Sequence, residues 1–293
     1  MTIKRDVLSL AGEWRFALDA DNVGIQERWF ARQLGETIAL PGTTDEAGYG
    51  DLTGEACTER LSRVWRWIGP AWYQKRVTIP KAWAGKRISL FLERTKDSQV
   101  WVDRTWMGGD DSLSTSHAFD LSRKLTPGEH TITILVDNAK LPPVGPCHQV
   151  DERTQTNWNG IVGRMELSAT DKVWFDDIQA HPQEAWIEVP GTESTEHRRT
   201  LRIAGTIGNV ARATGEARVT VRVEVVGRER EVRIPLQRFV VRLHGTATPL
   251  DLVVPVPVDI PVWDEFDRSM LRVRLSLTAG TERKPYRDES SIL

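Results

Sequence analysis

The feature that most constrains this chain is a two-residue alternation of apolar and polar side chains that recurs between Trp72 and Asn138. The segments Arg87–Leu92 and Thr131–Val136 show it most clearly. Because successive side chains of a β-strand point to opposite faces, this period predicts strands with one buried face. Glycine and proline separate the segments at 84–85, 108–109 and 127–128, as expected for turns. Several short strands of this kind predict an all-β fold, a β-sandwich or jelly roll.

The same stretch resembles the N-terminal sugar-binding domain of glycoside hydrolase family 2, the family of β-galactosidases and β-glucuronidases. The resemblance rests on an ordered series of short motifs: Leu10-Ala-Gly-Glu-Trp-Arg-Phe, Trp83-Ala-Gly-Lys-Arg, Val100-Trp-Val, Phe119-Asp-Leu, Pro127-Gly-Glu-His, Val136-Asp-Asn and Trp158-Asn-Gly-Ile-Val-Gly. One departure is Asp103-Arg104, where the family usually has Asn-Gly, and it changes the expected type of turn. The resemblance implies a galactose-binding-like jelly roll followed by an immunoglobulin-like sandwich.

The length of 293 residues predicts two domains. From about residue 182, arginine alternates with valine and leucine, as in Arg218–Val225 and Leu271–Leu277. This pattern predicts strands with one solvated face, and about four to seven of them indicate an immunoglobulin-like sandwich. We therefore expect a jelly-roll sugar-binding domain over residues 1–181 and an immunoglobulin-like domain over residues 182–293.

Composition excludes several classes of protein. The net charge of −2 offers no basic face for nucleic acid. No run of about eighteen apolar residues is present to cross a membrane. The first residues contain no secretory signal, which leaves the compartment open because such a signal can be removed. We expect no nucleic-acid or membrane partner, and oligomerisation stays open.

Neither metal nor cofactor is expected. Asp19–Asn22 could start a calcium loop, but an EF-hand needs a carboxylate at its twelfth position, where Phe30 stands. A solvated turn is the favoured interpretation. Cys57 and Cys147 lack metal-ligand spacing, and two free thiols are favoured over a single disulfide.

The sequence offers no candidate catalytic residue. The family resemblance implies two glutamates on a TIM barrel, one an acid/base and one a nucleophile, which this sequence lacks. The adjacent pairs Asp110-Asp111 and Asp176-Asp177 cannot replace them, since neighbours on a strand point to opposite faces. The chain by itself is expected to be inactive, with its own C-terminal barrel as partner in a longer protein.

Polar loops supply the candidate sugar-binding groups. The long loop at residues 40–50 is of a kind that carries function or is disordered. The matching family segment offers carboxylates, amides and one indole suited to a sugar, and a second loop adds weaker candidates. The candidates are Asp151, Glu152, Gln155, Asn157, Trp158 and Asn159, with Asp111 and His117 as the weaker pair. For some of them a structural role is an open alternative: a turn at Asn159-Gly160, domain packing for Trp158 and structural hydrogen bonding for His117.

Two hypotheses of function follow. The first is the non-catalytic N-terminal region of a family 2 glycosidase that acts on terminal β-linked galactose or glucuronate. The second is a free-standing carbohydrate-binding or adhesion module.

Overall fold

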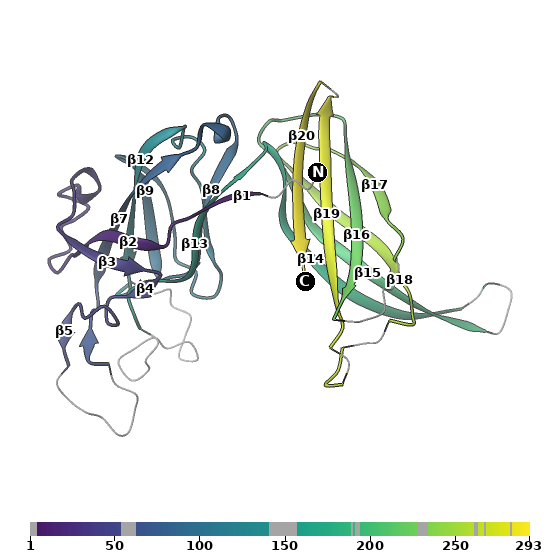
Figure 1. The fold of residues 1–293 in the computed structure, drawn as a ribbon, viewed down its shortest axis with the longest axis horizontal. Coiled ribbons are helices and arrows are strands. Elements are labelled where there is room, and N and C mark those ends of the chain that lie inside the picture. The colour runs from purple at the N-terminus through teal and green to yellow at the C-terminus, as the bar shows by residue number, and fades with distance from the viewer. Residues whose placement is uncertain are drawn as a thin grey trace. The chain divides into compact units, whose positions relative to one another are not determined.

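The computed structural model of the chain describes residues 5–53, 63–140, 157–188, 190, 194–227, 234–260, 263–266, 268–281 and 283–293. The chain divides into two compact units. The N-terminal unit is Asp6–Ala169, and the C-terminal unit is Thr170–Leu293 together with Arg5. Both units are built from strands, as Figure 1 shows. Among the described residues, no helix is both long and apolar enough to cross a membrane.

The N-terminal unit contains a six-stranded sheet in the order β10-β9-β12-β7-β2-β3 and a five-stranded sheet in the order β1-β13-β8-β11, with β4 paired to β13. Their strands are β1 Asp6–Ser9, β2 Gly12–Leu18, β3 Glu36–Leu40, β4 Gly42–Thr43, β7 Pro70–Ile79, β8 Arg87–Arg94, β9 Asp97–Val102, β10 Thr105–Asp110, β11 His117–Asp120, β12 Gly128–Asp137 and β13 Gly160–Thr170. The short pair β5 Asp51–Leu52 and β6 Trp65–Arg66 and the 3-10 turns η1 Trp29–Ala31 and η2 Lys81–Trp83 complete the unit.

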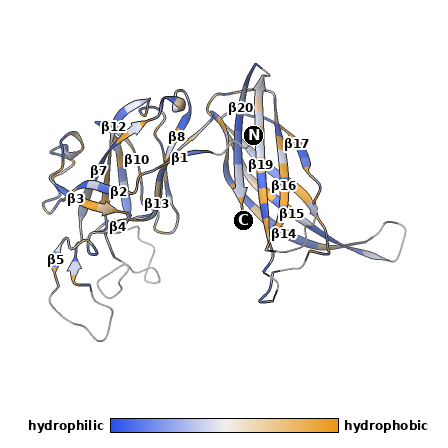
Figure 2. Ribbon diagram, in the orientation of Figure 1, coloured by the Kyte–Doolittle hydropathy of each residue, from blue (hydrophilic) through white to orange (hydrophobic). Residues whose placement is uncertain are grey.

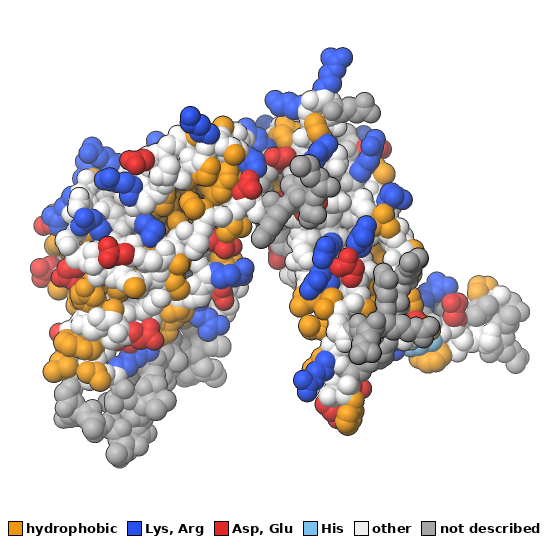
Figure 3. Space-filling model, viewed as in Figure 1, with side chains coloured by type: hydrophobic (Ala, Val, Ile, Leu, Met, Phe, Trp, Pro, Cys, Tyr) orange, Lys and Arg blue, Asp and Glu red, His pale blue; other side chains and the backbone are white. Residues whose placement is uncertain are grey.

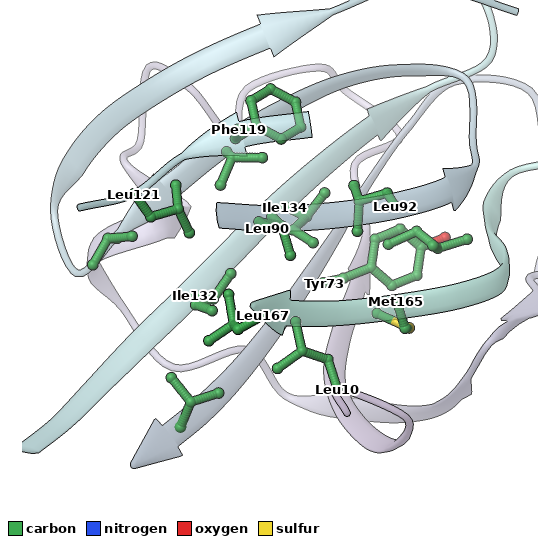
Figure 4. Packing of buried hydrophobic residues seen from close by; sticks show 14 of the residues in the cluster. Leu10, Tyr73, Leu90, Leu92, Phe119, Leu121, Ile132, Ile134, Met165 and Leu167 are labelled. Atoms are coloured by element: carbon green, nitrogen blue, oxygen red, sulfur yellow. The ribbon is translucent and has the colours of Figure 1, made fainter. Parts of the chain in front are cut away.

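One apolar core joins the two sheets of this unit. Alternate residues of β8 and β12 point into it, among them Leu90, Leu92, Ile132 and Ile134, all fully buried. Figure 4 shows these side chains gathered with Leu167 of β13. Since burying one such side chain contributes roughly 1.5–3 kcal/mol, the core fixes which face of each strand points inward. The alternation in the sequence thus predicted these strands correctly.

A second, smaller cluster lies on the outer face of the six-stranded sheet. Leu34, Trp72, Trp101 and Leu135 are buried there, with the ring of Phe30 stacked on Trp101 at 5.3 Å. Residues 19–35 cover this part of the face.

Asp19 fastens this cover to the sheet. Its Oδ2 accepts hydrogen bonds from Trp72 Nε1 at 3.0 Å and from Gly24 N at 2.8 Å. Gly24 permits this contact, because a Cβ at that position would lie 2.4 Å from Trp72 Nε1. Residues 20–22 form the expected exposed turn, but Asp19 itself is buried, because its carboxylate satisfies buried donors.

The C-terminal unit packs a three-stranded sheet, β14-β15-β18, with a four-stranded sheet, β17-β16-β19-β20. Its strands are β14 Val173–Glu188, β15 Thr195–Asn209, β16 Glu216–Val226, β17 Gln237–Arg242, β18 Ala247–Val256, β19 Met270–Thr281 and β20 Lys284–Ile292. Valines 219, 221 and 223 are buried while Arg218 and Arg222 are exposed. Figure 2 shows the resulting alternation of colour along the strands. The all-β fold class and the solvated arginine faces are confirmed.

We expected the boundary between the two domains to lie between residues 181 and 182, and the structure places it elsewhere. It falls between Ala169 and Thr170, because β13 pairs with β1 in the N-terminal unit whereas β14 pairs with β15 along its length. The first part of β14, which we expected in the first domain, therefore belongs to the second.

Candidate functional site

Three segments of the N-terminal unit meet at residues 157–160. Thr44 N donates to Asn159 O at 2.9 Å, and Gly160 pairs with Thr43 of β4. Thr95, between β8 and β9, donates from its hydroxyl to Gly160 O at 2.8 Å. The start of β13, the turn after β4 and the β8–β9 connection are therefore held at one place.

Asn159 is the buried centre of this junction. Its Oδ1 accepts a hydrogen bond from the Tyr73 hydroxyl at 2.8 Å, and its Nδ2 donates to Gly69 O at 2.8 Å and to Val136 O at 3.0 Å. The side chain has no exposed surface. Burial also raises the pKa of Tyr73 well above its usual range, so this hydroxyl stays a donor. In this arrangement the Asn159 amide binds the protein's own backbone and leaves no free group for a sugar.

Trp158 lies half-buried beside a lysine. The Lys96 ammonium stands 4.8 Å from the centre of the indole ring, within the range of a cation–π contact. Lys96 is only 7% exposed. Burial, together with the positive charges of Arg63 and Arg94, lowers the pKa of Lys96 to about 8. At neutral pH this is a charged but poorly solvated group against an aromatic face.

Two buried acceptor oxygens lie in the same segments. Among the described residues, Asp45 Oδ1 and Asn157 Oδ1 have no hydrogen-bond partner. The other oxygen of Asp45 accepts from Arg63 Nη1. A buried acceptor without a donor costs about 1–3 kcal/mol, so both oxygens are suited to a hydroxyl supplied by a ligand. Asp45 was not among the candidates named from the sequence, although it lies in the loop at residues 40–50, for which a functional role was one expectation.

His117 and Asp111 are used differently. The buried His117 Nε2 donates to Ser112 O at 2.8 Å, and its Nδ1 lies 2.7 Å from the Ser98 hydroxyl. These bonds tie the segment after β10 to β9 and β11, which supports the structural alternative for His117. Asp111 is exposed next to that segment.

Several candidates lie outside the described residues: Asp151, Glu152 and Gln155, and likewise Cys57 and Cys147. Within the described ranges, no group of three or more His, Cys, Asp or Glu side chains is placed to hold a metal ion.

Comparison with known proteins agrees with this architecture. Residues 7–170 match the sugar binding domain of glycosyl hydrolases family 2. A β-glucuronidase of Paenibacillus borealis is 31% identical over 196 residues, which are 60% of this chain and 31% of that protein.

Solved structures show the same fold. The Bacteroides uniformis β-glucuronidase 2, covalently bound to cyclophellitol-6-carboxylate aziridine, superimposes with a TM-score of 0.71 at 18% identity over 98% of this chain and 32% of its own. The Ruminococcus gnavus β-glucuronidase in complex with D-glucaro-d-lactam gives 0.67 at 15% identity over 100% of this chain and 45% of its own. The chain thus spans about a third of the length of the first relatives that it matches. With more than half of its residues matching the family's sugar-binding domain, the chain belongs to glycoside hydrolase family 2.

Proposed function

We propose that this chain is the non-catalytic N-terminal region of a family 2 glycosidase, and that it supports the binding of a terminal β-linked sugar beside a catalytic barrel. The observation that carries the proposal is the junction at residues 157–160. It combines an indole face with the acceptor oxygens of Asp45 and Asn157, which have no donor among the residues that the structure describes. Sugar hydroxyls are donors, and the apolar face of a pyranose stacks on an aromatic ring, so this combination suits a sugar.

Glucuronate is the sugar that we favour over galactose. The relatives named above are β-glucuronidases. Lys96 adds a poorly solvated positive charge next to Trp158, and such a charge attracts a carboxylate more strongly than one in bulk water does. Asp151, Glu152 and Gln155 are proposed as further contacts, because they precede the same junction in the sequence.

The test uses the complete protein and steady-state kinetics with nitrophenyl β-glucuronide and β-galactoside. Trp158→Ala and Asp45→Asn should each lower kcat/KM for the glucuronide by about tenfold, the effect of losing roughly 1.4 kcal/mol of transition-state binding. Trp106→Ala is the matched control, since Trp106 is an exposed tryptophan on β10. Unchanged kinetics in both site variants, with the fold retained, would return Trp158 and Asp45 to purely structural roles.

A further inference from the structure

A basic hollow of about 730 Å³ opens on the N-terminal unit, away from the junction at residues 157–160. Strands β2 and β7, the segment 30–33 and the turn between β9 and β10 supply its walls. Five cationic residues line it: Arg15, Arg32, Lys75, Arg76 and Arg104. Glu13 and Asp103 are the carboxylates of the lining. Figure 3 shows charges of both signs scattered over the visible surface of each unit, so a cluster in which cations outnumber carboxylates is a local feature.

The sheet itself places the cations. Arg15 pairs with Gln74, and the next residue on that face of β7, Arg76, pairs with Thr131. The cover formed by residues 19–35 ends at this point, where Gln74 Nε2 donates to Arg32 O at 3.0 Å. One half of the outer face is thus closed by aromatic side chains, and the other half is left open and basic.

A neutral group orients Arg15, which donates to the backbone oxygen of Leu34 at 3.1 Å. This carbonyl holds the guanidinium in place without neutralising it. Lys75 alternates with Gln74 and Arg76 on β7, so its ammonium points away from the hollow, to the Trp14 ring at 5.6 Å and to Glu13 O at 2.9 Å.

Two carboxylates near the hollow, those of Asp103 and Glu27, already have partners in the fold. The carboxylate of Asp103 accepts from Thr131 N at 2.9 Å and lies 2.9 Å from His130 Nδ1. Glu27 pairs with Arg32 at 3.4 Å, in an exposed and therefore weak ion pair. Burial lowers the pKa of Lys75, and the negative charge of Glu13 partly opposes that shift.

We propose that this hollow is a second saccharide site, which binds a short acidic oligosaccharide through its carboxylate or sulfate groups. Arginine forks bind such planar or tetrahedral anions through paired hydrogen bonds. The volume falls within the range of small-ligand sites. A nucleic acid is a poorer match, because the chain as a whole has a net charge of −2 and a pI near 6.3.

The hollow is separate from the junction. From Val136, whose carbonyl is bound by Asn159, to Thr131 at the hollow, β12 covers about 17 Å at roughly 3.4 Å per residue. The proposal rests on membership of a sugar-binding family and does not depend on the role proposed for Trp158.

The test is calorimetric titration of the full 293-residue chain at low salt with three hexasaccharides: an oligogalacturonate, a sulfated one and an uncharged one. The acidic ligands should bind and the uncharged one should not. The double variant Arg76→Gln/Arg104→Gln should weaken binding about tenfold, and Arg76→Lys/Arg104→Lys should restore part of it. The two acidic ligands distinguish carboxylate from sulfate recognition.

The matched control is Lys81→Gln/Arg123→Gln, which removes the same charge from exposed positions outside the lining. Binding should survive it, and should weaken with added salt as expected for exposed charges. Equal losses in the two double variants would overturn the proposal, as would equal binding of the uncharged hexasaccharide. Tighter binding of a single-stranded DNA oligonucleotide than of both acidic saccharides would also overturn it.

Discussion

Asn159 connects three parts of the N-terminal unit from a position without exposed surface. Through one amide it binds the hydroxyl of Tyr73 and the backbone oxygens of Gly69 and Val136. A family motif on the sequence made it a candidate for sugar binding, whereas its partners in the fold make it a structural residue that positions Trp158 and Asn157 next to it.

Removing this amide should destabilise the N-terminal unit. In Asn159→Ala, the buried Tyr73 hydroxyl would lose its acceptor, and the carbonyls of Gly69 and Val136 would each lose a donor, so we expect a loss of roughly 3 kcal/mol in the free energy of unfolding. Tyr73→Phe removes only one hydroxyl and should cost about 1 kcal/mol. Urea titration followed by tryptophan fluorescence measures both. A loss in Asn159→Ala no larger than that in Tyr73→Phe would contradict the central role of the amide.

Lys96 should make stability depend on pH in the alkaline range. Its pKa is lowered, first by burial, from 10.5 to about 8. The unfolded chain therefore binds more protons than the folded one between these two values, and stability should rise with pH across that window. Relative to Lys96→Met, the free energy of unfolding of the unmodified chain should increase by about 1–2 kcal/mol from pH 8 to pH 10.5. Parallel pH profiles for the two proteins would contradict this assignment.

At the scale of elements, the hairpin between β9 and β10 turns at Asp103-Arg104, where the family usually has Asn-Gly. Asp103 adopts a left-handed backbone with φ of 56°. Its carboxylate accepts from Thr131 N and contacts His130, on the neighbouring strand β12. These bonds offset the cost of a left-handed conformation, which aspartate and asparagine tolerate better than most residues.

Asp103→Ala should therefore cost about 2 kcal/mol, from the lost hydrogen bonds and the strained backbone together. Asp103→Asn keeps an acceptor and tolerates the same φ, so it should cost less than half as much. Thermal unfolding of both variants measures the difference. Equal destabilisation by alanine and asparagine would show that the backbone conformation and the acceptor do not matter here.

Strands could be predicted from the sequence where the alternation of apolar and polar residues lies within the strand itself. The alternation in β8 and β12 identified the strands and the buried faces, because one face of each enters a single core. Features that depend on distant partners could not be predicted. Asp19 finds its buried donor on Trp72, and β14 finds its partner in β15 rather than in the preceding sheet. The sequence motif named Trp158 and Asn157, which lie at the junction, and their contact with a sugar stays a prediction. The structural role of Asn159 could not be predicted, because its partners stand far away in the sequence.

At the scale of the whole chain, Arg5 belongs to the C-terminal unit although it precedes the N-terminal one. Its guanidinium donates to both carboxylate oxygens of Asp288, at 3.1 and 2.7 Å, and to Phe175 O. Asp288 is 2% exposed and also accepts from Phe175 N. A buried carboxylate of the last strand is therefore satisfied by the beginning of the chain.

Arg5→Ala should lower the stability of the C-terminal unit alone. We expect a loss of about 1–2 kcal/mol, below the usual cost of breaking a buried pair because the Arg5 side chain is 34% exposed. In calorimetry, one of two transitions should move to lower temperature while the other stays. Arg28→Ala, at an exposed arginine of the N-terminal unit, is the control. A shift of both transitions in Arg5→Ala would contradict the division into independent units.

The supporting role proposed for this chain is tested most directly by the calorimetric affinity of the 293-residue protein for glucuronate. Two or three hydrogen bonds at a typical value of about 1 kcal/mol each, plus about 1 kcal/mol for one stacked ring, give roughly 4 kcal/mol. That free energy corresponds to a Kd of about 1 mM. We predict binding no tighter than millimolar, and no turnover of nitrophenyl β-glucuronide by the same sample. A micromolar Kd for the monosaccharide would contradict the supporting role and identify the chain as a binding module in its own right.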